Sequence, residues 1–261
     1  MPTRISASSY LNTAPLVWSF IYGQNHGRVE IILDNAPARS AELLSQSRVD
    51  AALVPVIAYQ SIDDVFLVPD VCVGARDRVR SVCLATKGED LADVKTVALD
   101  ASSRTSVALT KIIFREFVGR DPDWTVSDPN ADQMLADDDC ALIIGDPALR
   151  LANSNYRVFH LAALWNKFTD LGFVFAMWMS RHERSPIDFA SARDEGLLHV
   201  EEMISNYASE IDLLPDEMRE YLTQNICYTV NEKMRQGMEL YFKLVQKHQL
   251  IDEVKPLRFC V

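Results

Sequence analysis

The stretch V-D-A-A-L-V-P-V at residues 49–56 decides the fold class of this 261-residue chain. Its apolar run is short and partly β-branched, which is typical of a strand buried on both faces in a parallel sheet. A second stretch of this kind, A-L-I-I-G-D, lies at residues 141–146. Segments with helical spacing precede both stretches, so the sequence predicts an α/β fold built around two buried strands.

The surrounding sequence repeats one pattern twice. Apolar runs typical of strands alternate with segments of helical spacing, and each half ends in one of the two buried strands. The predicted order is strand 4–8, helix 11–22, strand 29–33, helix 38–46 and strand 49–56 in the first half, and strand 96–99, helix 106–117, strand 124–126, helix 131–135 and strand 140–144 in the second. Each half is therefore predicted to be a βαβαβ unit.

Two further apolar segments, 71–86 and 173–180, are predicted to be hinge strands that cross between the units. Two crossings fit a two-lobed, hinge-bending binding fold. We expect lobe 1 to contain residues 1–86 and 174–261, including a helical C-terminal tail, and lobe 2 to contain residues 87–173. The ligand cleft should lie between the lobes, where the strands end.

Composition limits the class of protein. The chain has 37 Asp and Glu against 26 Lys and Arg, a formal net charge of -11, and 48% apolar residues, as in ordinary globular proteins. This acidic balance argues against nucleic acid as a partner, and no apolar segment fits a membrane span or a signal peptide, so we expect a cytoplasmic protein. Five widely spaced cysteines predict buried free thiols, and no metal-binding or nucleotide-binding motif occurs, so neither a metal nor a cofactor is predicted.

The turn after the first predicted strand is a candidate binding segment. Residues 8–15, S-S-Y-L-N-T-A-P, place Ser9, Tyr10 and Asn12 between a strand and a helix, where backbone N–H groups also face the cleft. The alternative is an ordinary helix cap, which serine, threonine and asparagine often form. Four polar groups exceed what one cap requires, so we predict a binding role.

The equivalent turn of the second unit, D-A-S-S-R-T-S at residues 100–106, also opens a helix. Ser103, Arg104, Thr105 and Ser106 could form a cradle for a carboxylate or phosphate, because helix N–H groups and a guanidinium both attract an anion. The alternative is helix capping by Ser103 or Thr105 with a solvated Arg104. The symmetry with the first unit favours binding.

Residues 73–81 carry three arginines in a chain with an excess of acid. If the segment is extended, Arg76, Arg78 and Arg80 share one face, and Ser81 enters the cleft with its hydroxyl. We predict that Arg78 and Arg80 bind substrate. A salt-bridged hairpin is the alternative, and for Arg76 the two interpretations are equally supported.

Gly145 and Asp146 end the buried strand of the second unit. Asp146 could orient a ligand hydroxyl, or it could cap the helix that follows Pro147, since Asp before Pro commonly opens a helix.

The chain resembles the chorismate dehydratase family of the futalosine route to menaquinone. Six ordered motifs carry this resemblance over nearly the whole chain: S-Y-L-N-T-A-P (9–15), V-D-A-A-L-V-P-V (49–56), R-V-R-S-V (78–82), A-L-D-A-S-S-R-T-S (98–106), L-I-I-G-D-P-A-L (142–149) and G-F-V-F-A-M-W (172–178). Gly172 stands where the family pattern leads us to expect proline, a small departure beside the hinge.

The resemblance implies a periplasmic-binding-protein-like fold of type 2, used as a cytoplasmic hydro-lyase that converts chorismate into 3-[(1-carboxyvinyl)oxy]benzoate. It implies catalytic roles for Asn12 and Ser81, and a carboxylate-binding role for the S-S-R-T-S turn. Two alternatives stay open: a solute-binding protein without catalysis, and the sister enzyme that releases 1,4-dihydroxy-6-naphthoate, whose N-terminal signature residues 9–15 lack.

The chemistry of chorismate fits these residues. The substrate is a dianion, so a chain of charge -11 must hold it with local donors such as helix N-termini, Arg78 or Arg80. Elimination removes the C3 proton and the C4 hydroxide, and Asn12 could stabilise the developing charge or orient the leaving group. No histidine base lies in the cleft motifs. We therefore expect the enolpyruvyl carboxylate of the substrate to take the proton.

Overall fold

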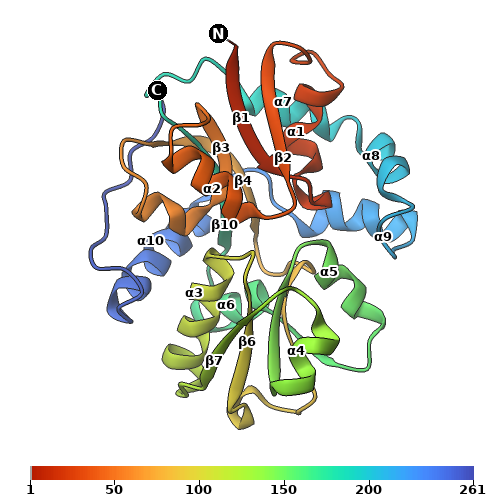
Figure 1. Ribbon diagram of the computed structural model, residues 1–261, viewed down its shortest axis with the longest axis vertical. Helices are drawn as coiled ribbons and strands as arrows, with labels where there is room; N and C mark the ends of the chain where they lie inside the picture. Colours follow the sequence, from red (N-terminus) through yellow and green to blue (C-terminus); the bar gives the residue numbers. More distant parts are fainter. Residues whose placement is uncertain (1) are drawn as a thin grey trace.

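The computed structural model describes the backbone of residues 2–261 and the side chains of these residues except 152 and 153. Two α/β lobes lie one above the other, each around a five-stranded sheet (Figure 1). The first sheet has the order β2-β1-β3-β10-β4 and the second the order β7-β6-β8-β5-β9. The strands of the first sheet are β1 (Thr3–Ser8), β2 (Val29–Asp34), β3 (Ala51–Pro55), β4 (Phe66–Ala75) and β10 (Phe173–Ser180). Those of the second are β5 (Val82–Thr86), β6 (Thr96–Asp100), β7 (Asp123–Ser127), β8 (Cys140–Ile144) and β9 (Arg157–His160).

Three parallel strands form the centre of each lobe. β1 pairs in parallel with β2 and β3, and β6 pairs in parallel with β7 and β8. The connecting helices are α1 (Ala14–Ile21), α2 (Pro37–Ser45), α3 (Thr105–Ile112) and α4 (Ala131–Asp137). Every residue of β3 and of β8 is buried, as their apolar runs predict. The predicted pair of βαβαβ units is confirmed.

The hinge differs from the prediction. β5 pairs with β8 in the second sheet, so residues 82–86 belong to lobe 2 and not to lobe 1. β10 lies in the first sheet, antiparallel to both β3 and β4. The chain crosses between the sheets at residues 76–81, and again through α6 (Leu161–Thr169), which follows β9. The apolar run V-C-L-A-T is fully buried in the second sheet, and the charged residues before it occupy the crossing.

Two of the predicted helices also begin or end differently. The helix predicted over residues 11–22 opens with a 3-10 turn, η1 (Leu11–Thr13), and only then becomes α1. The helix predicted over residues 106–117 ends in a π-helical turn, Ile113–Val118. The first difference makes the turn after β1 tighter than an α-helical start.

The C-terminal region is helical, as predicted, and wraps around the outside of lobe 1 (Figure 1). It contains α7 (Phe189–Leu197), α8 (Val200–Tyr207), α9 (Pro215–Glu220), the π-helical turn η6 (Tyr221–Asn225) and α10 (Glu232–Lys247). α10 packs against both β10 and α3, so it spans the two lobes. Its apolar stripe Met234, Met238, Tyr241 and Val245 is buried, which confirms a packing role. Within residues 2–261, no helix is long and apolar enough to cross a membrane.

Candidate active site between the lobes

The two lobes touch where their strands end. The backbone N–H of Leu11 donates to the Asp146 carboxylate, at 3.1 Å from Oδ1 and 3.3 Å from Oδ2. The N–H of Ile57 donates to Oγ1 of Thr105 at 3.3 Å, and Arg104 lies 3.7 Å from the carboxylate of Glu42. Each contact joins a residue of lobe 1 to one of lobe 2, so the cleft is closed.

Gly145 allows a further contact between the lobes. Its φ of +67° lies in the left-handed region that glycine adopts without strain. A Cβ at this position would lie only 2.6 Å from Cε2 of Tyr10. Glycine is therefore required twice here, once by the backbone and once by the Tyr10 ring.

A narrow cavity lies inside this contact. Polar side chains from the two strand-to-helix turns line it, and apolar side chains from the strands of both sheets form the remaining walls. The polar residues are Ser8, Tyr10, Asn12, Thr13, Ser103, Thr105 and Ser106; the others are Pro37, Leu53, Pro55, Val73, Val82, Ile144, Gly145, Phe175 and Ala176. Hydrogen-bond donors opposite an apolar surface suit a flat, largely hydrocarbon molecule with anionic substituents.

No side chain lining this cavity carries a formal charge at neutral pH. Tyr10 is its one ionisable group, and burial raises the pKa of that phenol, against a smaller opposing effect of a hydrogen bond from Ser102. Anions would instead meet hydroxyl groups and the N–H groups that begin α3, which no side chain caps. Among the described residues, no cluster of three His, Cys, Asp or Glu side chains could hold a metal ion.

Asp100 shapes the turn that presents Ser103, Thr105 and Ser106. Its buried carboxylate accepts hydrogen bonds from the Ser102 N–H at 2.9 Å, the Ser102 hydroxyl at 2.5 Å and the Ile144 N–H at 3.2 Å. Burial raises the pKa of Asp100, and these hydrogen bonds oppose the rise. The carboxylate thus ties the end of β6 to the end of β8, and it fixes the turn instead of facing the cavity.

Two of the predicted residues, Asn12 and Asp146, do not act as helix caps. In the turn after β1, Thr13 and not Asn12 bonds the local backbone, through Oγ1 to the carbonyl groups of Ser8 and Tyr10. The Oδ1 atom of Asn12 is buried and has no hydrogen-bond partner in the described part of the chain. Asp146 caps no helix of its own, because it accepts from Leu11 across the cleft.

Other predicted residues lie outside the cavity. The Ser9 hydroxyl donates to Oδ1 of Asn35 at 2.8 Å, on the outer side of the turn. The Arg104 side chain is 38% exposed and faces Glu42. Asp146 lies just behind the lining, and burial raises its pKa to about 6, although the hydrogen bond from Leu11 opposes this rise.

Ser81 is also outside the lining, but it is not at the surface. It is 1% exposed, and its Oγ has no hydrogen-bond partner within residues 2–261. The hydroxyl of Tyr221 is a third buried oxygen in the same condition. Tyr221 is not recognisable from the sequence, because it lies in the C-terminal helical region, far along the chain from every cleft motif, and no local pattern sets it apart from a core tyrosine.

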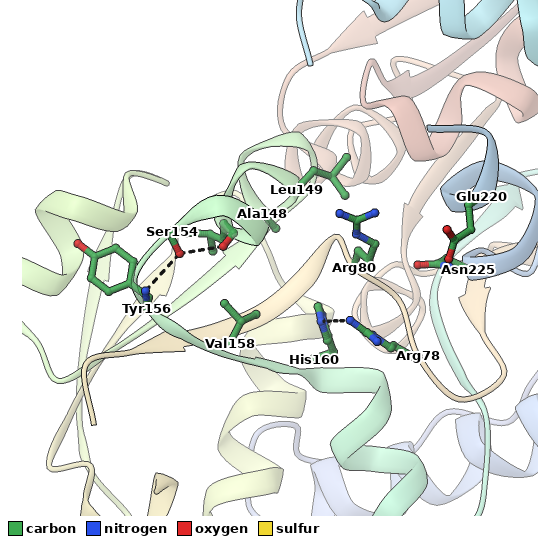
Figure 2. Close-up of a pocket in the computed structure, with 11 residues that line it drawn as sticks. Arg78, Arg80, Ala148, Leu149, Ser154, Tyr156, Val158, His160, Glu220 and Asn225 are labelled. Carbon is green, nitrogen blue, oxygen red and sulfur yellow. Dashed lines mark hydrogen bonds between the residues drawn. The ribbon is translucent and has the colours of Figure 1, made fainter. Parts of the chain in front are cut away.

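The predicted arginines line a second cavity of about 440 Å³ beside the crossing (Figure 2). Residues 76–81 bend instead of forming a strand, so the three arginines do not share one strand face. Arg76 and Arg78 are exposed, and Arg80 pairs with Glu217 at 3.3 Å.

His160 shapes the arginine side of this second cavity. Burial, followed by the neighbouring Arg78 and Arg80, lowers the pKa of His160 to about 4. The imidazole is therefore neutral at pH 7, and its Nε2 accepts a hydrogen bond from Nη2 of Arg78 at 3.0 Å (Figure 2). Arg78 is thus held at the edge of the second cavity, away from the cavity that Asn12 lines.

Solved structures share the two-lobed fold at low sequence identity. A protein of Archaeoglobus fulgidus matches with a TM-score of 0.70 at 14% identity, over 95% of this chain and 98% of its own. The periplasmic aliphatic sulphonate-binding protein SsuA of Escherichia coli matches with a TM-score of 0.65 at 16% identity, over 99% of this chain and 93% of its own. These neighbours show a periplasmic-binding-protein-like fold, as the sequence predicts.

Sequence similarity identifies the family. A chorismate dehydratase of Thermus thermophilus is 30% identical over 265 aligned residues, which cover 92% of this chain and 94% of that protein. The model of a family described as menaquinone biosynthesis matches residues 3–247, which include both strand-to-helix turns and the whole cavity lining. The chain therefore belongs to the menaquinone biosynthesis family.

Proposed function

We propose that this protein is a chorismate dehydratase, a hydro-lyase that removes water from chorismate to give 3-[(1-carboxyvinyl)oxy]benzoate in the cytoplasm. The 30% identical relative of that name supports the substrate. The observation that carries the proposal is the cavity between the lobes, where uncharged donors from two turns face an apolar wall. Chorismate matches both surfaces: its two carboxylates could face the donors, and its hydrocarbon ring could face the apolar wall.

Binding would rely on dipoles instead of cations. Ser103 and Ser106 are the best placed donors, because both line the cavity and neither hydroxyl has a hydrogen-bond partner in the described residues. Together with the N–H groups that begin α3, they would hold one carboxylate. Such donors are fixed by the fold, so they need little reorganisation when the anion arrives.

Asn12 would act on the reacting ring. It lines the cavity while its Oδ1 is buried, so the amide nitrogen is left to face the substrate. There an N–H could stabilise charge that develops on the ring carboxylate as the C3 proton leaves, or hold the departing C4 hydroxyl. The proton and the hydroxide together give the one molecule of water that is lost.

The lining offers no protein base. It contains no carboxylate, imidazole or amine, and the raised pKa keeps Tyr10 protonated. We therefore assign proton abstraction to the enolpyruvyl carboxylate of the substrate, with the enzyme fixing the conformer that brings it to C3.

A purely solute-binding function is the second candidate, because the structural neighbours include a sulphonate-binding protein. Mass spectrometry of chorismate after incubation with the purified protein separates the candidates. Loss of one water with formation of the substituted benzoate supports the dehydratase. Unchanged chorismate, together with a rise in melting temperature on its addition, would favour binding alone. Absence of both effects would reject chorismate as the ligand and reopen the sister naphthoate synthase activity.

A further inference from the structure

Three buried oxygen atoms around the cavity wall have no hydrogen-bond partner among the described residues. They are Oδ1 of Asn12, Oγ of Ser81 and the hydroxyl of Tyr221, none of which makes a hydrogen bond within the described part of the molecule. Buried polar groups are nearly always paired in folded proteins, because an unpaired group loses its water without compensation. What sets these three apart from other unpaired groups, such as the Tyr228 hydroxyl, is that one of them belongs to Asn12, which lines the cavity.

The three side chains come from distant parts of the sequence and meet in space. Asn12 lies in η1, Ser81 ends the first crossing between the lobes, and Tyr221 begins η6. Burial raises the pKa of Tyr221 far above its usual range, while Ser81 and Asn12 oppose this rise from within hydrogen-bonding range of the phenol. η6 is a π-helical turn, a rare form that often occurs at functional sites.

We propose that Tyr221 is a positioning residue that aims the amide of Asn12 at the substrate. Its hydroxyl donates to Oδ1 of Asn12, which turns the amide nitrogen into the cavity, and it accepts from Oγ of Ser81. The inference rests on the proposed dehydratase function and deepens it.

The order of donors and acceptors supports this direction. Asn12 Oδ1 can only accept, whereas the Ser81 and Tyr221 hydroxyls can donate. One chain, from Ser81 to Tyr221 to Asn12, satisfies all three buried oxygens at once. The three groups make no hydrogen bond with one another within the described residues, and catalytic hydrogen bonds often tighten only when substrate binds.

The arrangement also gives Ser81 a place in the reaction without contact to substrate. Ser81 lies behind the lining, so it would act by orienting Tyr221. The family resemblance implies catalytic roles for Asn12 and Ser81. In this proposal both roles depend on the same group, the amide N–H of Asn12, which Ser81 orients through Tyr221.

Replacement of Tyr221 by phenylalanine tests the proposal, because it removes only the hydroxyl. We expect kcat for chorismate dehydration to fall about 10-fold to 100-fold, the scale of a misplaced catalytic donor, with KM changed less than about threefold. Without substrate the melting temperature should change little, because the Tyr221 hydroxyl makes no hydrogen bond within the described residues. A residue of purely structural importance would show the opposite pattern.

Tyr228→Phe is the matched control. Tyr228 is also buried, its hydroxyl also has no partner in the described chain, and it neighbours Tyr221. Its replacement should leave kcat and KM unchanged. In an Asn12→Ala background, Tyr221→Phe should have little additional effect on kcat, because its action passes through the missing amide.

The outcomes separate two failures. If the parent protein removes water from chorismate but Tyr221→Phe keeps kcat within about twofold, the positioning role is wrong and the proposed function stands. An equal loss of kcat in Tyr221→Phe and Tyr228→Phe also overturns it. If the parent protein leaves chorismate unchanged, the proposed function fails and the inference fails with it.

Discussion

The two cavities differ in the kind of group that lines them. The cavity between the lobes has no charged side chain, while the second, beside the crossing, has Arg78, Arg80 and Glu220 in its wall. On charge alone, a dianion would be assigned to the second cavity. The first offers donors fixed by two tight turns, an apolar wall and a closed cleft, and fixed dipoles in a site that excludes water act strongly on charge. We therefore expect neutral backbone and hydroxyl donors to form the anion site of this protein of net negative charge.

The largest effect should come from the one amide in the uncharged cavity. Asn12→Ala should lower kcat by about 10² to 10³, the scale of one lost preorganised donor. KM should change much less, because the carboxylate contacts are elsewhere. Single-turnover rates with saturating chorismate measure this directly.

The melting temperature of the same variant tests the capping alternative. Asn12 bonds no backbone group in the described residues, so its loss should cost well under the roughly 1 kcal/mol of a helix cap. A large loss of stability with normal turnover would reject the catalytic role and show that Asn12 has a purely structural role.

Carboxylate binding in the uncharged cavity is tested by Ser106→Ala. Ser106 lines the cavity at the start of α3, and a hydrogen bond to a charged ligand is worth about 1.5 to 3 kcal/mol. We expect KM to rise about tenfold or more, with kcat within about threefold. Ser205→Ala, which removes an exposed hydroxyl on α8, is the control and should change neither constant. An unchanged KM in Ser106→Ala would move the carboxylate away from this turn.

Asp146 adds a pH dependence to the closed cleft. Its pKa is raised to about 6 against an ordinary value of 3.8, chiefly by burial, so the closed form binds the proton more tightly than an open, solvated form. The resulting stabilisation of closure is present below about pH 4 and is lost as pH rises through 6. KM of the parent should therefore increase several-fold between pH 5 and 7.

Asp146→Asn should remove this step, because an amide oxygen still accepts from the Leu11 N–H but carries no charge. Its KM above pH 6 should be lower than that of the parent. Asp188→Asn is a suitable control: it keeps the cap of α7, far from the cleft, and should leave the pH profile unchanged. If KM of Asp146→Asn increased in the same way between pH 5 and 7, the pH dependence would belong to another titratable group.

The centre of each lobe was predictable because its determinants are local. The buried runs of β3 and β8, and the helical spacing around them, are visible within a few residues. The sheet to which β5 belongs was not predictable, because V-C-L-A-T is equally apolar in either sheet and only long-range pairing with β8 decides it. β9 was missed because four partly exposed residues, R-V-F-H, lack a clear alternation.

In the candidate site, too, the features with local determinants were predictable and those that depend on long-range packing were not. The turns at Asn12 and Ser106 were found because strand ends and helix starts lie together in α/β sheets. Arg80 was predicted in the cleft because extended geometry was assumed for a segment that bends. Tyr221 could not be found, since its meeting with Ser81 depends on the packing of the C-terminal helices.

The smallest effect is expected at the arginine-lined cavity. Arg80 pairs with Glu217 at 3.3 Å and lies outside the lining between the lobes, so it can reach bound substrate only through its field. Within the closed protein, Arg80→Ala should raise KM less than about threefold and leave kcat nearly unchanged, because such a field is weakened by distance and by solvent. Arg80→Lys separates charge from hydrogen bonding, since it keeps the charge but not the fork of donors. If Arg80→Ala raised KM tenfold or more and Arg80→Lys did not restore it, the guanidinium would contact a carboxylate directly. The substrate would then extend toward the second cavity. The conclusion that substrate binds only in the uncharged cavity, and that the arginine-lined cavity takes no part, would be wrong.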